Sequence, residues 1–336
     1  MKKTVRINSD SFMSRLNKTV LCLLATLLVF AMVSCTDEEE EYQKEWPGGT
    51  LPGRFSVSAS QQVCFSQGNL QVKLRTQTAE YNPTWRFATH QYDFVGNDTI
   101  GNVYEDGIKC SNALGSYQRN ELYTGWLDLF GWGTSGWESG ARAYRPESLD
   151  GESDCYYPGS DYNNDLTGSC ARADWGVYNA ISNGGGQAGL WRTLTYPEWD
   201  YLCSQREGAE EKYGVAAVML SDGTYINGCV FLPDQWTLPK DCAFTPGVSD
   251  IGYIRNVYTL KQWSKMEDAG AVFLPAAGQR SSYTVQYSGS HGYYWSATHY
   301  NKKLAYYLYV SSYNVTAYDY HDRAYGRSVR LVKDVD

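Results

Sequence analysis

The sequence predicts an α+β fold with few short helices, small antiparallel sheets and long loops. Short runs in which apolar and polar residues alternate recur along the chain, as they do in half-buried strands. Only three segments combine helical spacing of apolar residues with a helix start signal. Glycine, asparagine and serine separate these elements, so short strands joined by loops are expected to dominate.

The N-terminus has the pattern of an export signal. Five basic residues precede an apolar run at positions 20–33, which is too short to span a membrane comfortably but suits a signal-peptide core. The run ends in Met32-Val33-Ser34-Cys35, which resembles the lipobox in which bacterial lipoproteins acylate the cysteine. We therefore predict a lipoprotein signal peptide at 1–35, with Cys35 as the lipidated residue. An ordinary signal-peptidase site is the alternative.

Residues 36–53 are predicted to form a linker, acidic at first and then rich in proline and glycine. The acidic run at 36–41 resembles the tag behind the lipidated cysteine of Bacteroidota lipoproteins sent to the outer face of the outer membrane. This predicts a lipid-anchored, outer-membrane protein exposed at the cell surface. Without residues 1–35 the chain keeps 24 of its 29 basic and 36 of its 37 acidic side chains, a net charge of −12. Such a charge argues against a nucleic-acid partner, which requires a basic face.

A domain at 54–334 follows, and its first part has strand patterns. A further short strand is expected at 85–87, and the tryptophan- and glycine-rich stretch 126–137 is expected to be a packed irregular loop. The alternating apolar residues of the first strands are Phe55, Val57, Ala59, Val63, Phe65, Leu70, Val72 and Leu74.

Three short helices are expected later in the domain. The first lies at 174–181, where apolar residues stand three apart. The other two begin with capping boxes that start at Thr195 and Thr259. A buried strand is expected at 271–275, and only strands and turns after it.

Cysteine usage permits few disulfides. Seven cysteines follow residue 35, and none of them forms a Cys-x-x-Cys pair. Cys155 and Cys170 could close a loop outside the cytoplasm, whereas buried free thiols are the alternative.

Motifs for catalysis or metal binding are missing from the sequence. The four histidines include no pair at the helical spacing of metal ligands. Residues 161–165 alternate oxygen ligands like a calcium loop, but Leu166 and Arg172 stand where that loop requires glycine and glutamate, so a polar turn is expected. A Gly-x-Ser-x-Gly nucleophile elbow is also absent. We therefore predict no cofactor, no metal and no enzymatic activity.

A block of tyrosines near the C-terminus carries the clearest functional signal. Residues 281–325 hold 12 of the 29 tyrosines, where an even spread would give about four. Serine, histidine, asparagine, aspartate and threonine stand between them. Tyrosine with small polar neighbours is typical of adaptable binding surfaces, because it supplies large contact area at low entropic cost. Half-buried strands, in which tyrosine is a favoured residue, are the alternative.

Several ordered segments recur together in one known protein family. They are Gln67-Gly68-Asn69-Leu70-Gln71, positions 128–136, Ala173-Asp174-Trp175-Gly176, Trp191-Arg192-Thr193-Leu194-Thr195 with Glu198-Trp199, positions 270–278, Gly292-Tyr293-Tyr294-Trp295-Ser296 and positions 326–332. With these segments the chain resembles the Fibrobacter succinogenes major paralogous domain family over about residues 54–333. This resemblance implies a C-type-lectin-like fold, related to that of formylglycine-generating enzymes.

The resemblance also implies a role for the tyrosine-rich segment 281–330. In the variable proteins of diversity-generating retroelements, which share this fold, adenine-directed mutagenesis rewrites asparagine codons near the C-terminus, chiefly to Asn, Tyr, Ser, His, Asp and Thr. The segment has this residue spectrum. Ordinary family members are also rich in tyrosine here, so a diversified and a fixed segment both stay open. The ligand-binding residues implied in this way are Tyr293, His299, Tyr300, Asn301, Tyr307, Tyr309, Ser311, Tyr313, Thr316, Tyr318, Asp319, Tyr320 and His321.

Composition and resemblance together predict a non-catalytic surface adhesin or receptor, whose ligand is a macromolecule or a glycan. One alternative is a cell-envelope structural protein or a pilus-like accessory subunit. A degenerate enzyme of the formylglycine-generating type ranks last, because that chemistry needs cysteines in the C-terminal half and none follows Cys242.

Overall fold

The computed structural model describes residues 44, 46–76, 78, 80–95, 104–105, 108–109, 125–137, 158–281 and 284–335. The chain divides into two compact units, Met1–Lys44 and Glu45–Asp336. The predicted signal peptide at 1–35 and its Cys35 lie outside the described residues.

The ordered unit begins before Arg54. Leu51 is fully buried, and its backbone N–H donates to the carbonyl of Phe65 at 3.0 Å. Thr50 forms an antiparallel bridge with Ser66. The proline- and glycine-rich half of the predicted linker is therefore part of the packed unit.

The described helices are short and few, and most strands pair antiparallel, so the predicted α+β class is confirmed. The α-helices are α3 (Trp175–Tyr178), α4 (Tyr196–Asp200) and α5 (Leu260–Asp268), and α4 continues into a π-helical turn, η4 (Tyr201–Gln205). The 3-10 helices are η1 (Pro47–Gly49), η2 (Pro158–Ser160), η3 (Gly168–Ala173), η5 (Ala209–Glu211) and η6 (Gly252–Arg255).

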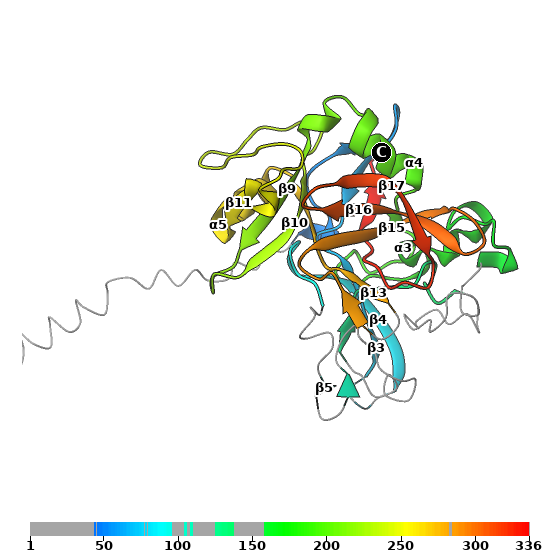
Figure 1. Ribbon diagram of the computed structural model, residues 1–336. Coiled ribbons are helices and arrows are strands. Elements are labelled where there is room, and N and C mark those ends of the chain that lie inside the picture. Colours follow the sequence, from blue (N-terminus) through cyan, green and yellow to red (C-terminus); the bar gives the residue numbers. More distant parts are fainter. Residues whose placement is uncertain are drawn as a thin grey trace, which may run out of the picture. The chain divides into compact units, whose positions relative to one another are not determined.

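The strands form several small sheets (Figure 1). One sheet has the order β1 (Phe55–Ser56), β2 (Gln62–Phe65), β18 (Leu331–Asp334), β8 (Arg192–Thr193). A second has the order β11 (Val257–Thr259), β9 (Tyr213–Met219), β10 (Tyr225–Phe231), β12 (Val272–Pro275). A third has the order β4 (Tyr81–Phe87), β3 (Leu70–Arg75), β7 (Trp126–Leu127). Two hairpins pair β5 (Tyr104–Glu105) with β6 (Ile108–Lys109), and β13 (Gln279–Ser281) with β14 (Thr284–Gln286). The tyrosine-rich segment supplies the last sheet, β15 (His291–His299), β16 (Leu304–Ser311) and β17 (Val315–Asp322).

Both predicted capping boxes are present. The hydroxyls of Thr195 and Thr259 accept the backbone N–H three residues on, and the side chains of Glu198 and Gln262 accept the backbone N–H of the cap. The predicted helix at 174–181 is shorter than expected, because the backbone is extended again at Asn179. The predicted buried strand appears as β12, and the irregular stretch 128–135 is buried throughout.

The core lies on both faces of the β15–β16–β17 sheet. Alternate side chains of β16 enter different clusters, so Tyr307 packs into one and Leu308 into the other. The first cluster contains buried tryptophans such as Trp132, and the second contains Phe65 and Trp199. Burial on both faces fixes β15 and most of β16 as a rigid layer, whereas most of β17 is exposed or half-buried.

The two ends of the unit pair with each other, since β18 lies antiparallel between β2 and β8. In the described part of the chain, no helix is long and apolar enough to cross a membrane.

Candidate functional site: the tyrosine sheet

Five tyrosine rings meet at one end of the β15–β16–β17 sheet, and we call them the five-tyrosine cluster. They are Tyr196 at the start of α4, Tyr300 after β15, Tyr306 on β16, and Tyr318 and Tyr320 on β17. Figure 1 shows α4 beside the end of this sheet. The cluster therefore joins chain segments that are about a hundred residues apart in sequence.

The rings contact one another in defined geometries. Tyr196 stacks on Tyr306 with ring centroids 4.2 Å apart and planes 14° apart. Tyr300 stacks on Tyr320 at 3.7 Å and 7°. Tyr306 meets both Tyr300 and Tyr320 edge to face, at 5.3 Å and 5.9 Å. The two edge-to-face contacts of Tyr306 are of the kind that stabilises aromatic pairs beyond their buried area.

The cluster lies at the surface and is uncharged at neutral pH. Tyr318 is 63% exposed, Tyr300 40% and Tyr320 37%, while Tyr196 and Tyr306 are half-buried. Burial raises the pKa of Tyr196 and of Tyr306, and a side-chain hydrogen bond with Tyr300 raises the pKa of Tyr320. The cluster therefore presents ring surface together with neutral hydroxyl groups.

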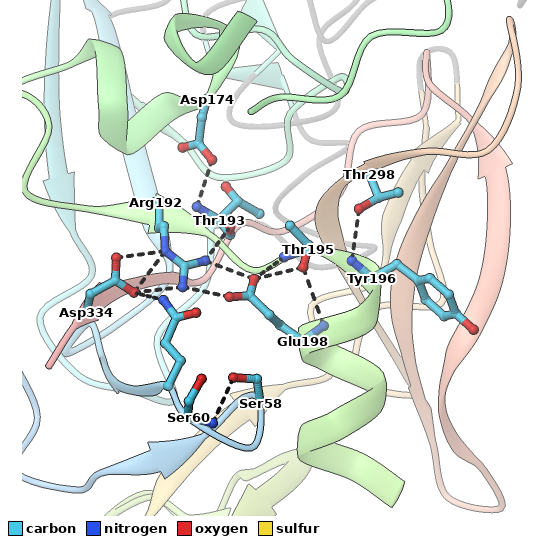
Figure 2. A network of polar contacts seen from close by, with 11 residues as sticks. Ser58, Ser60, Asp174, Arg192, Thr193, Thr195, Tyr196, Glu198, Thr298 and Asp334 are labelled. Carbon is cyan, nitrogen blue, oxygen red and sulfur yellow. Dashed lines mark hydrogen bonds and ion pairs between the residues drawn. The ribbon is translucent and has the colours of Figure 1, made fainter. Parts of the chain in front are cut away.

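A polar network around Arg192 fixes the position of Tyr196 (Figure 2). The guanidinium of Arg192 donates to Glu198 at 2.7 and 2.9 Å and to Asp334 at 2.7, 3.0 and 3.1 Å. Glu198 is also the capping carboxylate of α4, and it accepts the N–H and the hydroxyl of Thr195. The backbone N–H of Tyr196 itself donates to the hydroxyl of Thr298, a β15 residue, at 3.0 Å.

This network joins the first turn of α4 to β8, β15 and β18. Burial alone would lower the pKa of Arg192, but its hydrogen bonds with Asp334 and Glu198 raise it above the ordinary value. The guanidinium thus stays charged and matches both carboxylates. Asp174, nearby in Figure 2, accepts the N–H of Thr193 at 2.7 Å and caps α3 by accepting the N–H of Gly176.

The opposite face of the sheet carries a second aromatic group, built around Arg327. The guanidinium is fully buried, and its central carbon lies 3.6 Å from the ring centroid of Tyr307 and 4.6 Å from that of Trp295. Tyr293 and Tyr325 stand slightly farther away, at 5.1 and 5.8 Å. We call these five residues the Arg327 cage.

Hydrogen bonds and charge effects extend from the Arg327 cage. Arg327 donates to the side-chain oxygen of Gln279 through two nitrogens, at 3.0 and 3.2 Å. Burial lowers the pKa of Arg327 to about 10, so the group remains a cation at neutral pH. Burial raises the pKa of Asp319, opposed by Arg327, and burial and Arg327 together lower the pKa of His321. The Arg327 side chain is therefore itself a buried cation, held between aromatic rings and with polar side chains at one edge.

The structure does not bring all the predicted ligand residues together. Tyr300, Tyr318 and Tyr320 belong to the five-tyrosine cluster. Tyr293 and Tyr307 are only 6% and 7% exposed and belong to the Arg327 cage. Tyr309, Asp319 and His321 lie on that same face, and Tyr309 packs its ring 5.5 Å from Tyr293.

Other predicted residues shape turns. The Asn301 side chain accepts the N–H groups of residues 303 and 304, and the buried Ser311 hydroxyl accepts those of 313 and 314. The Thr316 hydroxyl accepts the N–H of Tyr318 at 3.1 Å. Tyr313 projects from the β16–β17 turn and is 73% exposed.

His299 holds the end of β15 in place. Its ring Nδ1 lies 2.6 Å from the carboxylate of Asp165, which also accepts the backbone N–H of His299. Asp165 is the last residue of the stretch that resembled a calcium loop, and Asp161 accepts the N–H of Asn163 in the polar turn expected there. In the searched, described residues, no three His, Cys, Asp or Glu side chains gather as a group that could hold a metal ion.

The cysteine side chains of the described core are thiols. Cys170 is free and buried, and its possible partner Cys155 lies outside the described residues. Burial raises the pKa of Cys203 to about 12 and that of Cys229 well above its ordinary value. Neither thiol is therefore set up as a nucleophile at neutral pH.

Two members of the five-tyrosine cluster were missed by sequence reasoning, Tyr196 and Tyr306. Tyr196 follows a helix cap and stands far from the tyrosine-rich segment, so nothing local marks it. Tyr306 lies on the same face of β16 as Leu308 and Val310. Because side chains of a strand alternate between its two faces, this periodicity would have placed Tyr306 and Tyr307 on opposite faces.

Comparison with known proteins gives one partial match. A family model described as a domain of unknown function (DUF8237) matches residues 248–332, which include four of the five cluster tyrosines but not Tyr196. No curated protein and no solved structure matches the chain.

Proposed function

We propose that this protein is a non-catalytic binding protein displayed at the cell surface, and that the five-tyrosine cluster is the centre of its ligand-binding surface. The observation that carries the proposal is that rings from α4, β16, β17 and the β15–β16 connection contact one another while remaining accessible. An exposed group of large aromatic residues is a typical feature of interaction sites.

The cluster combines rigidity with adaptable chemistry. Its frame is fixed, because Leu308 and Val310, on the same face of β16 as Tyr306, are fully buried and Arg192 clamps α4. Tyrosine rings pack against apolar surface at low entropic cost, and their hydroxyls donate and accept hydrogen bonds. These properties suit a macromolecular or glycan ligand. The net charge of −8 for the chain disfavours nucleic acid.

The finer fold and the location belong to the same proposal. We propose that the α+β unit is C-type-lectin-like, on the strength of the sequence resemblance together with its small sheets, short helices and long irregular segments. We also propose that Cys35 anchors the chain to the outer membrane through a lipid. Replacement of Cys35 by alanine is then expected to abolish metabolic labelling with palmitate. Labelling that persists in this variant would contradict the anchor.

The ligand-binding proposal is tested by screening and substitution. Purified protein is applied to an array of immobilised polysaccharides and extracellular matrix proteins, and the triple variant Tyr300→Ala, Tyr318→Ala, Tyr320→Ala is applied to the same array. We expect the triple variant to lose the signal, while Tyr225→Ala, which removes an exposed tyrosine from β10, keeps it. Equal binding by a folded triple variant would reject the site.

One observation favours a second candidate, an envelope assembly subunit. Ile254 and Ile251 around η6 are 66% and 57% exposed, and Gly252 lies against Ser312 in the β16–β17 turn, next to the exposed Tyr313. Exposed apolar side chains of this kind can mark a protein contact. If this candidate is right, Ile251→Asp with Ile254→Asp removes the protein from envelope complexes and leaves array binding unchanged.

A further inference from the structure

We propose that Tyr300 and Tyr320 form a site of oxidative modification, at which a one-electron oxidant joins the two rings into an intrachain dityrosine. This inference concerns a covalent property of the surface and does not depend on what the surface binds. It rests on the geometry, accessibility and surroundings of this one ring pair.

The two rings are placed for coupling. Their ring centroids are 3.7 Å apart and their planes differ by 7°. This is the shortest centroid distance between two aromatic rings among the described residues. At this separation the two rings lie face to face, so ring carbons of one phenol lie against ring carbons of the other.

Both rings are also accessible. Tyr300 is 40% and Tyr320 37% exposed, so an oxidant in solution can reach either phenol. Tyr300 lies in the connection after β15, whose turn is held by the Asn301 side chain and by backbone hydrogen bonds at Leu304. Exposed side chains next to a turn can rotate into the twisted arrangement of a biaryl.

The other stacked tyrosine pair is less suited to the reaction. The ring centroids of Tyr196 and Tyr306 are 4.2 Å apart, but both residues are half-buried. Tyr196 is also the first residue of α4, which the Arg192–Glu198 ion pair holds in place. Tyr306 instead stands edge to face against both Tyr300 and Tyr320 and supports their stack. Among the described residues, no aromatic ring contacts the exposed Tyr225 or Tyr313, so neither has a partner there for coupling within the chain.

Each phenol loses one electron and its hydroxyl proton to give a phenoxyl radical, whose unpaired spin is partly on the ring carbons beside the oxygen. A carbon–carbon bond forms between one such carbon of each ring, and the hydrogens on those carbons move to the two oxygens as the rings regain aromaticity. The protein loses two electrons and two protons in total. A peroxidase passes them to hydrogen peroxide, which becomes two molecules of water.

The test uses the purified full-length protein with horseradish peroxidase and hydrogen peroxide. We expect the monomer to lose the mass of two hydrogens and to gain dityrosine fluorescence. Trypsin cuts after Arg280, Lys302, Lys303 and Arg323, so peptide 281–302 should appear joined to peptide 304–323. Fragmentation should place the bond between Tyr300 and Tyr320. The thermal midpoint of the linked monomer should rise by a few degrees, because the link restricts the unfolded chain.

Conservative variants separate the chemistry from folding. Tyr300→Phe and Tyr320→Phe keep a ring in the stack but cannot form a phenoxyl radical, so each should abolish the linked peptide. The control Tyr225→Phe should retain it. The proposal is overturned if all dityrosine joins different chains, or if the linked peptides persist in either stack variant.

Discussion

The ring of Tyr196, in the first turn of α4, lies parallel to the ring of Tyr306, on β16, with centroids 4.2 Å apart. The backbone of Tyr196 is held to β15 through Thr298, and its helix is held to β8 and β18 through Arg192. Tyr196, although far from the tyrosine-rich segment in sequence, is thus part of the same surface. Its position depends on the charged network around Arg192.

Replacing Tyr196 by alanine should weaken ligand binding. Loss of this ring removes contact area and the support of Tyr306, so we expect an affinity loss of about 3- to 30-fold for the ligand found on the array. Tyr196→Phe should lose less, because it keeps the stacked ring. Titration by surface plasmon resonance measures both variants against Tyr225→Ala. A Tyr196→Ala variant with wild-type affinity would remove α4 from the binding surface.

Replacing Arg192 by methionine should destabilise the unit. The variant leaves the half-buried Glu198 and the exposed Asp334 without this partner. We expect the free energy of unfolding to fall by about 1 to 3 kcal/mol, chiefly because of Glu198. The matched control is Lys265→Met, which breaks an exposed pair with Asp241 and should cost about 0.5 kcal/mol or less. Urea unfolding compares the two, and equal losses would show that the network has no special role.

Replacing Arg327 by lysine should also destabilise the protein, although the charge is kept. The flat guanidinium lies over the ring of Tyr307 and donates to Gln279 through two nitrogens. A lysine ammonium is not flat and has a single nitrogen, so it cannot do both. We expect a loss of about 1 to 3 kcal/mol in the free energy of unfolding. Chemical denaturation measures it, and a Lys variant as stable as the wild type would mean that charge alone matters in the Arg327 cage.

Asp174 should make stability depend on pH. Burial raises its pKa to about 6, against the effect of hydrogen bonds from Thr193 and Gly176, whereas the unfolded value is about 3.9. Between these values the folded state binds more protons than the unfolded state, so stability from this group falls as pH rises towards 6 and is then constant. The advantage of wild type over Asp174→Asn should therefore grow by about 1 to 3 kcal/mol as pH is lowered from 7 to 4. A difference that does not change with pH would show that Asp174 has an ordinary pKa.

Local signals predicted much of the scaffold. The two capping boxes, the buried strand β12 and the early strands β2 and β3 follow from patterns within a few residues, and each is present. The start of β4 at Tyr81 was missed, because polar residues and Pro83 interrupt its alternation.

The arrangement of the tyrosines could not be predicted in the same way. Both faces of β16 are covered, so Tyr306 and Tyr307 look alike in sequence although one enters an exposed cluster and the other a buried cage. Irregular pairing between Tyr307 and Tyr309 on β16 also shifts which β17 side chains share a face. The contact between Tyr196 and Tyr306 depends on tertiary packing, which no local pattern encodes.

The most direct test of the five-tyrosine cluster as the ligand site is protection from nitration in the wild-type protein. Tetranitromethane is applied with and without the ligand identified on the array, and modification is read for each tyrosine by mass spectrometry. We predict that the ligand slows nitration of Tyr300, Tyr318 and Tyr320 and leaves Tyr225 unchanged. Unaltered nitration of all three cluster tyrosines under saturating ligand would contradict the site.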